Sequence, residues 1–152
     1  MNRILIATDG SPSAHEAIEF GLELAKEQGA SVVFVHVLRR LDLVPMAGFG
    51  MVGARMHDVT PEDERVLEEA DALADLRDVP STTKLLTGDV VDEIVAYADN
   101  LDVDLIVVGS RGHGTLTSAL LGSVSRGVLS ESKRPVAVVR AAPTHARALA
   151  SV

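Results

Sequence analysis

The chain has 152 residues, 47% of them hydrophobic, and no cysteine. This length is typical of one domain with a substantial core, and the lack of cysteine excludes disulfides, thiolate metal sites and a cysteine nucleophile. The net charge of −8 opposes nucleic-acid binding, and no apolar run reaches the roughly 18 residues that span a bilayer, so we expect a soluble cytoplasmic protein without nucleic-acid or membrane partners.

The first part of the chain predicts a strand, a helix and a second strand. Residues 3–8 form an apolar run that is typical of a buried strand. Ser11 suits a helix N-cap and Pro12 suits the first helical position, so we expect a helix that ends near Gly29. Residues 32–38 predict the second buried strand.

The segment from residue 39 to about 59 shows no clean periodicity and is rich in glycine and methionine. A connection of this length is unusual inside a compact domain. We therefore expect a lid or a partner surface here. Thr60 and Pro61 then begin a helix whose many charges predict a solvated face.

The second half continues the alternation of strands and helices. The pattern predicts strands at 82–86, 104–108 and 136–140, and helices at 90–100 and up to about 130. Five strands and four helices result. This alternation favours a parallel sheet that is covered by helices on both faces.

Two glycine-containing segments follow the strand at 104–108. The first is Gly109-Ser110-Arg111-Gly112, and the second, nine residues later, is Gly122-Ser123-Val124-Ser125. Glycines let backbone N–H groups approach an anion, and a helix N-terminus and serine hydroxyls add donors, so the pattern predicts a phosphate-binding loop. Magnesium or manganese could bridge the phosphate oxygens. We assign no metal ligand to a side chain, and a plain glycine turn is the alternative.

This pattern, with four further segments in the same order, resembles the universal stress protein family in its ATP-binding branch. The further segments are 3–11, 34–37, 88–95 and 134–139. The resemblance covers one domain, residues 1–140. Residues 141–152 form a C-terminal tail, for which disorder is an open alternative.

The resemblance implies an α/β fold of the Rossmann-like, adenine nucleotide alpha hydrolase-like type. Its open parallel five-stranded sheet has helices on both faces and strand order 3-2-1-4-5. Such a sheet binds ligands beyond the carboxyl ends of its strands, where the strand order reverses. The family's nucleotide-binding positions correspond here to Asp9, Val37, Gly109, Gly112, Gly122, Ser123, Val124 and Ser125.

Two of these residues, and Arg111 beside them, have a second interpretation. By resemblance Asp9 lies near the adenine and ribose, but an aspartate there also caps the helix at Ser11. Val37 would pair with the adenine edge through its backbone, whereas the residues alone indicate a core valine. Arg111 is either a phosphate ligand or an exposed or partner-contacting side chain.

Binding is favoured over catalysis. No Gly-x-x-x-x-Gly-Lys-Ser/Thr loop or kinase signature occurs, and no lysine lies in the glycine segments. We expect a stress-response protein that acts as an ATP-dependent regulatory switch, with at most slow ATP hydrolysis and no assigned catalytic residue. The alternatives are a nucleotide-free homodimeric scaffold and a nucleotide-cleaving enzyme, for which only Asp9, Ser125 and His113 offer suitable groups.

The last strand carries the expected self-association. Val136, Ala137, Val138 and Val139 are apolar with little alternation, and an apolar edge strand favours pairing with another chain. The family resemblance implies a homodimer through this strand. The alternative is an edge that the tail from Ala141 covers.

Overall fold

The computed structural model describes residues 1–39, 41–48, 50, 52–56, 58–111 and 121–141. Gly112 and His113 lie outside the described residues, as does the tail after Ala141. No helix in the described ranges is both long and apolar enough to cross a membrane.

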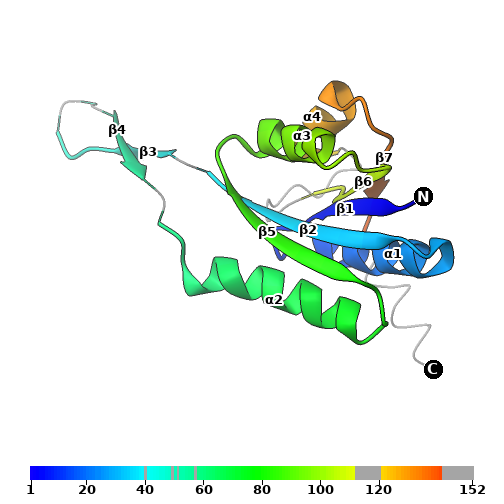
Figure 1. Ribbon diagram of the computed structural model, residues 1–152. Coiled ribbons are helices and arrows are strands. Elements are labelled where there is room, and N and C mark those ends of the chain that lie inside the picture. The colour runs from blue at the N-terminus through cyan, green and yellow to red at the C-terminus, as the bar shows by residue number, and fades with distance from the viewer. Residues whose placement is uncertain (40, 49, 51, 57, 112–120, 142–152) are drawn as a thin grey trace.

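A five-stranded parallel sheet forms the centre of the molecule (Figure 1). Its strands are β1 (Arg3–Ala7), β2 (Ser31–Leu38), β5 (Ser81–Thr87), β6 (Leu105–Gly109) and β7 (Val136–Val139). They are arranged in the order β5-β2-β1-β6-β7. Counted alone, these strands follow the expected order 3-2-1-4-5, and the labels differ because two further strands interrupt the count.

Two helices cover each face of the sheet (Figure 1). The helices are α1 (Pro12–Gln28), α2 (Pro61–Asp75), α3 (Val90–Asn100) and α4 (Ser123–Glu131). Because side chains alternate along a strand, Ile4 and Ile6 of β1 join the core under α1 and α2, and Leu5 joins the core under α3 and α4. The expected fold class is confirmed.

The helix ends follow the local signals of the sequence. The Ser11 side chain accepts a hydrogen bond from the Ala14 N–H, and Gly29 ends α1 in the left-handed conformation with φ +64°. Thr60 and Asp63 form a reciprocal capping box at the start of α2.

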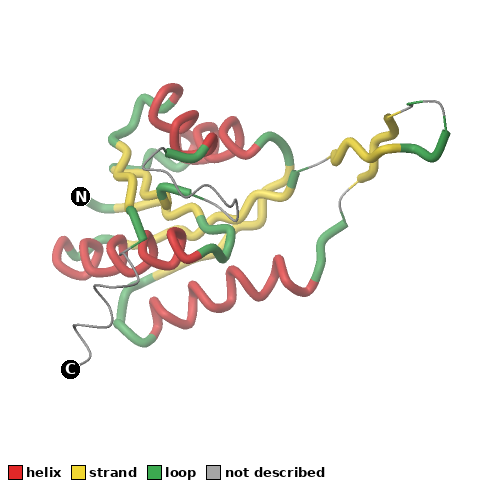
Figure 2. Tube along the Cα trace, turned by 180° about the vertical axis from the view of Figure 1, so that it is seen from behind, coloured by secondary structure: helices red, strands yellow, loops and turns green. Residues whose placement is uncertain are grey.

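The segment 39–59 contains an antiparallel hairpin that the sequence analysis missed. Strands β3 (Leu41–Pro45) and β4 (Val52–Met56) pair with each other and project away from the main sheet in both views (Figures 1 and 2). Gly48 and Gly50 adopt positive φ in the connection, which glycine allows at little cost. The expectation of five strands was therefore wrong: the described ranges contain seven. Pro45 and Gly53 lie within these strands, and both residue types are depleted in strands and typical of loops.

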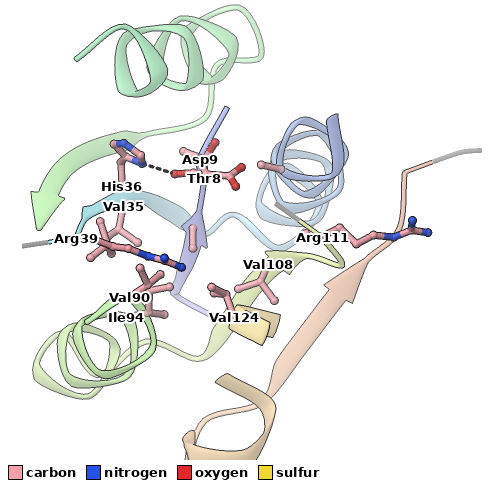
Figure 3. Close-up of a pocket in the computed structure, with 14 residues that line it drawn as sticks. Thr8, Asp9, Val35, His36, Arg39, Val90, Ile94, Val108, Arg111 and Val124 are labelled. Carbon is pink, nitrogen blue, oxygen red and sulfur yellow. Dashed lines mark hydrogen bonds between the residues drawn. The ribbon is translucent and has the colours of Figure 1, made fainter. Parts of the chain in front are cut away.

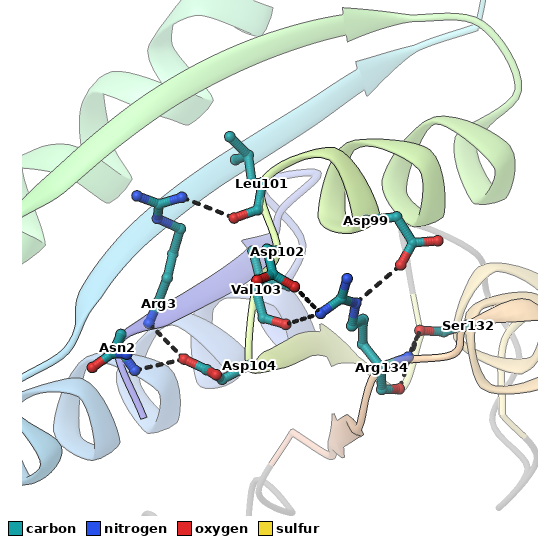
Figure 4. Close-up of polar contacts among 9 residues, drawn as sticks. All are labelled: Asn2, Arg3, Asp99, Leu101, Asp102, Val103, Asp104, Ser132 and Arg134. Carbon is teal, nitrogen blue, oxygen red and sulfur yellow. Dashed lines mark hydrogen bonds and ion pairs between the residues drawn. The ribbon is translucent and has the colours of Figure 1, made fainter.

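Polar contacts fasten the amino ends of the strands (Figure 4). The Asp104 carboxylate accepts hydrogen bonds from the backbone N–H groups of Asn2 and Arg3, and these bonds lower its pKa. Arg134 binds Asp99 at 3.0 Å and Asp102 at 2.6 Å. At the opposite, carboxyl end of the sheet, the residues that follow the strands surround a cleft.

Candidate functional site

A cleft opens at the carboxyl ends of β1, β2 and β6, where the order of the strands reverses (Figure 3). Its walls are mainly apolar, and its polar groups come from the strand ends. The lining residues are Ala7, Thr8, Asp9, Ala14, Val35, His36, Val37, Arg39, Val90, Ile94, Val108, Gly109, Arg111 and Val124. Four of the predicted residues therefore lie around one cleft: Asp9, Val37, Gly109 and Val124.

A second recess adjoins the cleft between the starts of α3 and α4. We call it the side hollow; it is lined by Arg39, Gly88, Asp89, Val90, Val91, Ser123 and Val124. Three of these residues also line the cleft: Arg39, Val90 and Val124. The side hollow thus brings Ser123 to the border of the cleft.

The start of α4 lacks a side-chain cap. Its N-cap residue is Gly122, and no side chain accepts a hydrogen bond there. The first N–H groups of a helix have no partner within the helix and carry the positive end of its dipole. The start of α4 is therefore suited to an anion.

Ser110 connects three elements behind the cleft. Its N–H donates to the Val139 carbonyl at 2.7 Å, and its carbonyl accepts from the Gly122 N–H at 2.7 Å. The Ser125 hydroxyl donates to the same Ser110 carbonyl at 3.1 Å and is within 3.0 Å of the Gly122 carbonyl. Ser125 is only 2% exposed. Its hydroxyl is therefore bound to loop backbone behind the cleft, which leaves its backbone N–H, in the first turn of α4, as the group of Ser125 that can meet a ligand.

Asp9 takes part in the turn that begins α1. Its Oδ1 accepts a hydrogen bond from the Ser11 N–H at 2.9 Å. Ser11 in turn donates from its hydroxyl to the Arg111 carbonyl at 3.3 Å, which ties the β6 loop to the α1 start. Asp9 thus supports the start of α1 without being its cap, because the Ser11 side chain accepts the Ala14 N–H. The same half-buried Asp9 side chain lines the cleft.

Two predicted glycines lie against backbone. A Cβ at Gly109 would stand 2.7 Å from the Ser13 carbonyl carbon and 2.8 Å from the Ala14 nitrogen. A Cβ at Gly122 would lie 3.3 Å from the Ser110 oxygen. Packing against the start of α1 therefore already requires a glycine at position 109. The need for glycine at positions 109 and 122 thus comes partly from close contacts with the α1 start and with the loop at Ser110.

His36 joins the cleft to the start of α2. Its Nδ1 lies 2.9 Å from the Thr8 carbonyl oxygen and its Nε2 lies 3.0 Å from Asp63 Oδ1. Both ring nitrogens therefore face oxygen atoms that can accept a hydrogen bond. Burial raises the pKa of Asp63, but hydrogen bonds from the Thr60 hydroxyl and N–H and the contact with His36 outweigh burial and lower it to about 2.

The sequence pattern did not predict several of the residues that line the cleft. His36 lies on β2 within a segment that was noted only as a family landmark, and Arg39 begins the segment without periodicity. Val90 and Ile94 lie in the helix expected at 90–100 and were not predicted as site residues. The spacing of Val90 and Ile94, one turn apart on α3, was the available signal that one helix face lines the cleft. The Arg111 guanidinium points away from the cleft (Figure 3).

The fold and the cleft define a class of protein: a Rossmann-like α/β protein with a ligand cleft at the reversal of strand order. Residues 1–140 match the model of the universal stress protein family, and the chain belongs to that family. It is 36% identical over 146 residues to the universal stress protein YxiE of Bacillus subtilis, with 91% of this chain and 99% of that protein covered.

Solved structures agree with this assignment. A universal stress protein in complex with cAMP has a TM-score of 0.69 and 25% identity, with 93% of this chain and 98% of that chain covered. The universal stress protein of Archaeoglobus fulgidus in complex with dAMP has a TM-score of 0.65 and 25% identity, with coverage of 91% and 98%. These related proteins bind adenine nucleotides.

Proposed function

We propose that this protein binds ATP in the cleft. The observation that carries the proposal is the uncapped start of α4, which lies beside an apolar cleft at the reversal of strand order. A nucleotide has both an apolar, planar base and an anionic phosphate chain. The apolar cleft suits the base, and the uncapped start of α4 suits the phosphates. The two related structures with cAMP and dAMP support an adenine nucleotide.

The proposed orientation follows from the two surfaces. The base packs on the apolar wall that includes Val90 and Ile94, and the Val37 backbone pairs with its edge. Asp9 binds the ribose. The phosphates meet the backbone around Gly109 and at the α4 start. The described residues contain no group of three or more His, Cys, Asp or Glu side chains that could hold a metal ion. We propose that magnesium or manganese binds through the phosphate oxygens.

The phosphate-binding backbone divides between two segments. Gly109 and Gly112 belong to the first, and Gly122, Ser123, Val124 and Ser125 to the second. Gly112 lies outside the described residues. In the second segment we assign the N–H groups of Val124 and Ser125 and the exposed Ser123 hydroxyl to phosphate oxygens.

The proposed role is regulatory. ATP would order the loop around the α4 start, and a partner would recognise the altered surface. The described cleft residues include no lysine, and the Ser125 hydroxyl is bound to backbone carbonyls. These features support binding with at most slow hydrolysis over a nucleotide-cleaving enzyme. Because ATP is a cytoplasmic metabolite, the proposal implies a cytoplasmic protein.

Self-association through β7 completes the proposal. β7 is the last strand of the sheet and all four of its residues are partly exposed. An open apolar edge favours pairing with the same strand of a second copy. A homodimer without nucleotide is the scaffold alternative, and the packing of Gly109 against α1 is compatible with either function.

The test has two parts. Purified protein is denatured and the supernatant is assayed for nucleotide that co-purified. Protein freed of nucleotide is then titrated with ATP and magnesium by isothermal calorimetry. Released ATP or saturable binding is expected. An empty protein that gives no binding heat and no thermal shift with ATP would contradict the proposal and favour the scaffold.

A further inference from the structure

Arg39 places a positive charge where the cleft meets the side hollow. It directly follows β2, and its guanidinium points into the cleft (Figure 3). The same side chain lines both the cleft and the side hollow. Arg39 is therefore the charged group common to the apolar cleft and the recess at the α4 start.

Nothing in the described part of the chain neutralises this charge. Arg134, in contrast, is paired with two carboxylates (Figure 4). Arg39 makes neither a hydrogen bond nor an ion pair with any residue that the structure describes. A guanidinium stays charged at any physiological pH. Arg39 thus offers its five N–H donors to something outside the described chain.

The acidic groups nearby are already in use at helix starts. Asp89 lines the side hollow, and its Oδ1 accepts the Asp92 N–H as the N-cap of α3. Asp9 lines the cleft and accepts the Ser11 N–H. Neither carboxylate is paired with Arg39. A positive group therefore stands in a recess of a protein whose net charge is −8.

We propose that Arg39 is a specificity-determining residue that binds the phosphate chain of the nucleotide and sets a preference for ATP over less phosphorylated ligands. The inference rests on the proposed function. A guanidinium binds phosphate oxygens through two parallel hydrogen bonds. Arg39 shares the side hollow with Ser123 and Val124, so it approaches the anion from the β2 side and the α4 start approaches it from the other.

A phosphate contact and a base contact predict different losses of ligand affinity when Arg39 is replaced. A guanidinium can also stack on an aromatic ring, and adenosine would then depend on Arg39 as strongly as ATP does. The shared hollow with the α4 start favours the phosphate. The number of phosphates on the ligand is therefore the variable that separates the two contacts.

The experiment compares three ligands and four proteins. Isothermal calorimetry measures ATP, AMP and adenosine binding to wild type, Arg39→Gln, Arg39→Lys and Arg65→Gln, each at low and high salt. Arg65 is an exposed α2 arginine outside the cleft, so its variant controls for net charge. All variants are first checked for an unchanged melting temperature.

Arg39→Gln is expected to weaken ATP about tenfold, as the loss of a charged hydrogen bond implies. AMP should lose less, and adenosine should keep its affinity. The salt dependence of ATP binding should also become shallower. Arg39→Lys should fall between the wild type and Arg39→Gln, and Arg65→Gln should match the wild type.

Two results would overturn the inference while leaving nucleotide binding intact. Equal losses for ATP and adenosine would assign Arg39 to the base, and unchanged ATP affinity would assign it to solvent. If the wild type bound none of the three ligands, the proposed function itself would fail, and the role of Arg39 with it.

Discussion

The Ser125 hydroxyl donates a hydrogen bond of 3.1 Å to the Ser110 carbonyl, which joins the first turn of α4 to the end of β6. Both serines are buried. The Ser110 carbonyl also accepts the Gly122 N–H, and the Ser110 N–H reaches Val139 of β7. The geometry of the α4 start therefore depends on bonds to β6.

Ser125→Ala should destabilise the protein by about 1 kcal/mol, because it removes the hydroxyl that faces the Ser110 and Gly122 carbonyls. ATP affinity should fall with it as the α4 start loosens. Thermal unfolding and calorimetry measure the two effects. Ser123→Ala, at the exposed neighbouring position, should leave stability unchanged. A loss of affinity in Ser125→Ala without loss of stability would show direct contact with the ligand instead.

Gly109→Ala should destabilise the fold by about 2 kcal/mol, because its Cβ would lie 2.7 Å from the α1 backbone and force β6 and α1 apart. Denaturant unfolding gives the free energy. Gly29→Ala is the control: its Cβ would meet nothing within 4 Å, so only its positive φ of +64° should cost about 1 kcal/mol. Wild-type stability in Gly109→Ala would refute the packing explanation.

Asp9→Asn separates the two roles of Asp9. The amide oxygen can still accept the Ser11 N–H, whereas the charge is lost. We expect an unchanged melting temperature and an ATP affinity about fivefold weaker, and in Asp9→Ala a loss of both stability and affinity. Calorimetry and thermal unfolding of both variants measure this. Wild-type affinity in Asp9→Asn would leave Asp9 with the turn role alone.

The Asp63 contacts predict a pH dependence of stability. The pKa of Asp63 is about 2 in the folded protein, below its ordinary value of 3.8, so the folded state favours the ionised form. This contributes roughly 2 kcal/mol to the free energy of unfolding. The contribution is fully present above the unfolded pKa and disappears as the pH falls from about 4 to about 2.

Asp63→Asn should therefore differ most from the wild type at pH 7 and least near pH 2, as measured by denaturant unfolding at several pH values. Glu64→Gln, at the next position of α2, controls for the loss of a negative charge near the helix dipole. A wild-type to Asp63→Asn difference that does not change with pH would contradict the assignment.

Val138→Pro tests the edge of the sheet. The Pro135 and Val139 carbonyls accept hydrogen bonds from β6, and strand residues alternate, so the Val138 N–H faces the open edge. Proline there should block pairing with a second copy and keep the β6–β7 bonds. Sedimentation velocity should show a dimer for wild type and Val138→Ala and a monomer for Val138→Pro. A monomeric wild type would refute the dimer.

Local signals in the sequence predicted the caps of the helices well. Ser11, Pro12 and Gly29 act through contacts within a few residues, so the bounds of α1 could be predicted from the chain alone. The five strands of the main sheet carried continuous apolar runs or turn signals. Their order came from the family resemblance, because pairing between distant strands leaves no local mark.

Long-range contacts could not be predicted. The packing of Gly109 on Ser13 and the hydrogen bonds of Ser110 join residues that are far apart in the sequence. The residue types at positions 109 and 110 do not by themselves reveal these contacts. The β3–β4 hairpin was missed because Pro45 and Gly53, which lie within its strands, are residue types typical of loops. Arg39 was missed because its importance depends on where the side chain of a strand-end residue points, which periodicity does not report.

The most direct test of the nucleotide site is a titration of ¹⁵N-labelled protein with ATP and magnesium, followed through the backbone amide signals in NMR spectra. We predict that the largest shifts belong to Asp9, Val37 and Gly109 and to the α4 start at 122–125. Unchanged spectra, or shifts confined to the hollow that Phe20 and Val139 line beside α1, would contradict nucleotide binding in the cleft.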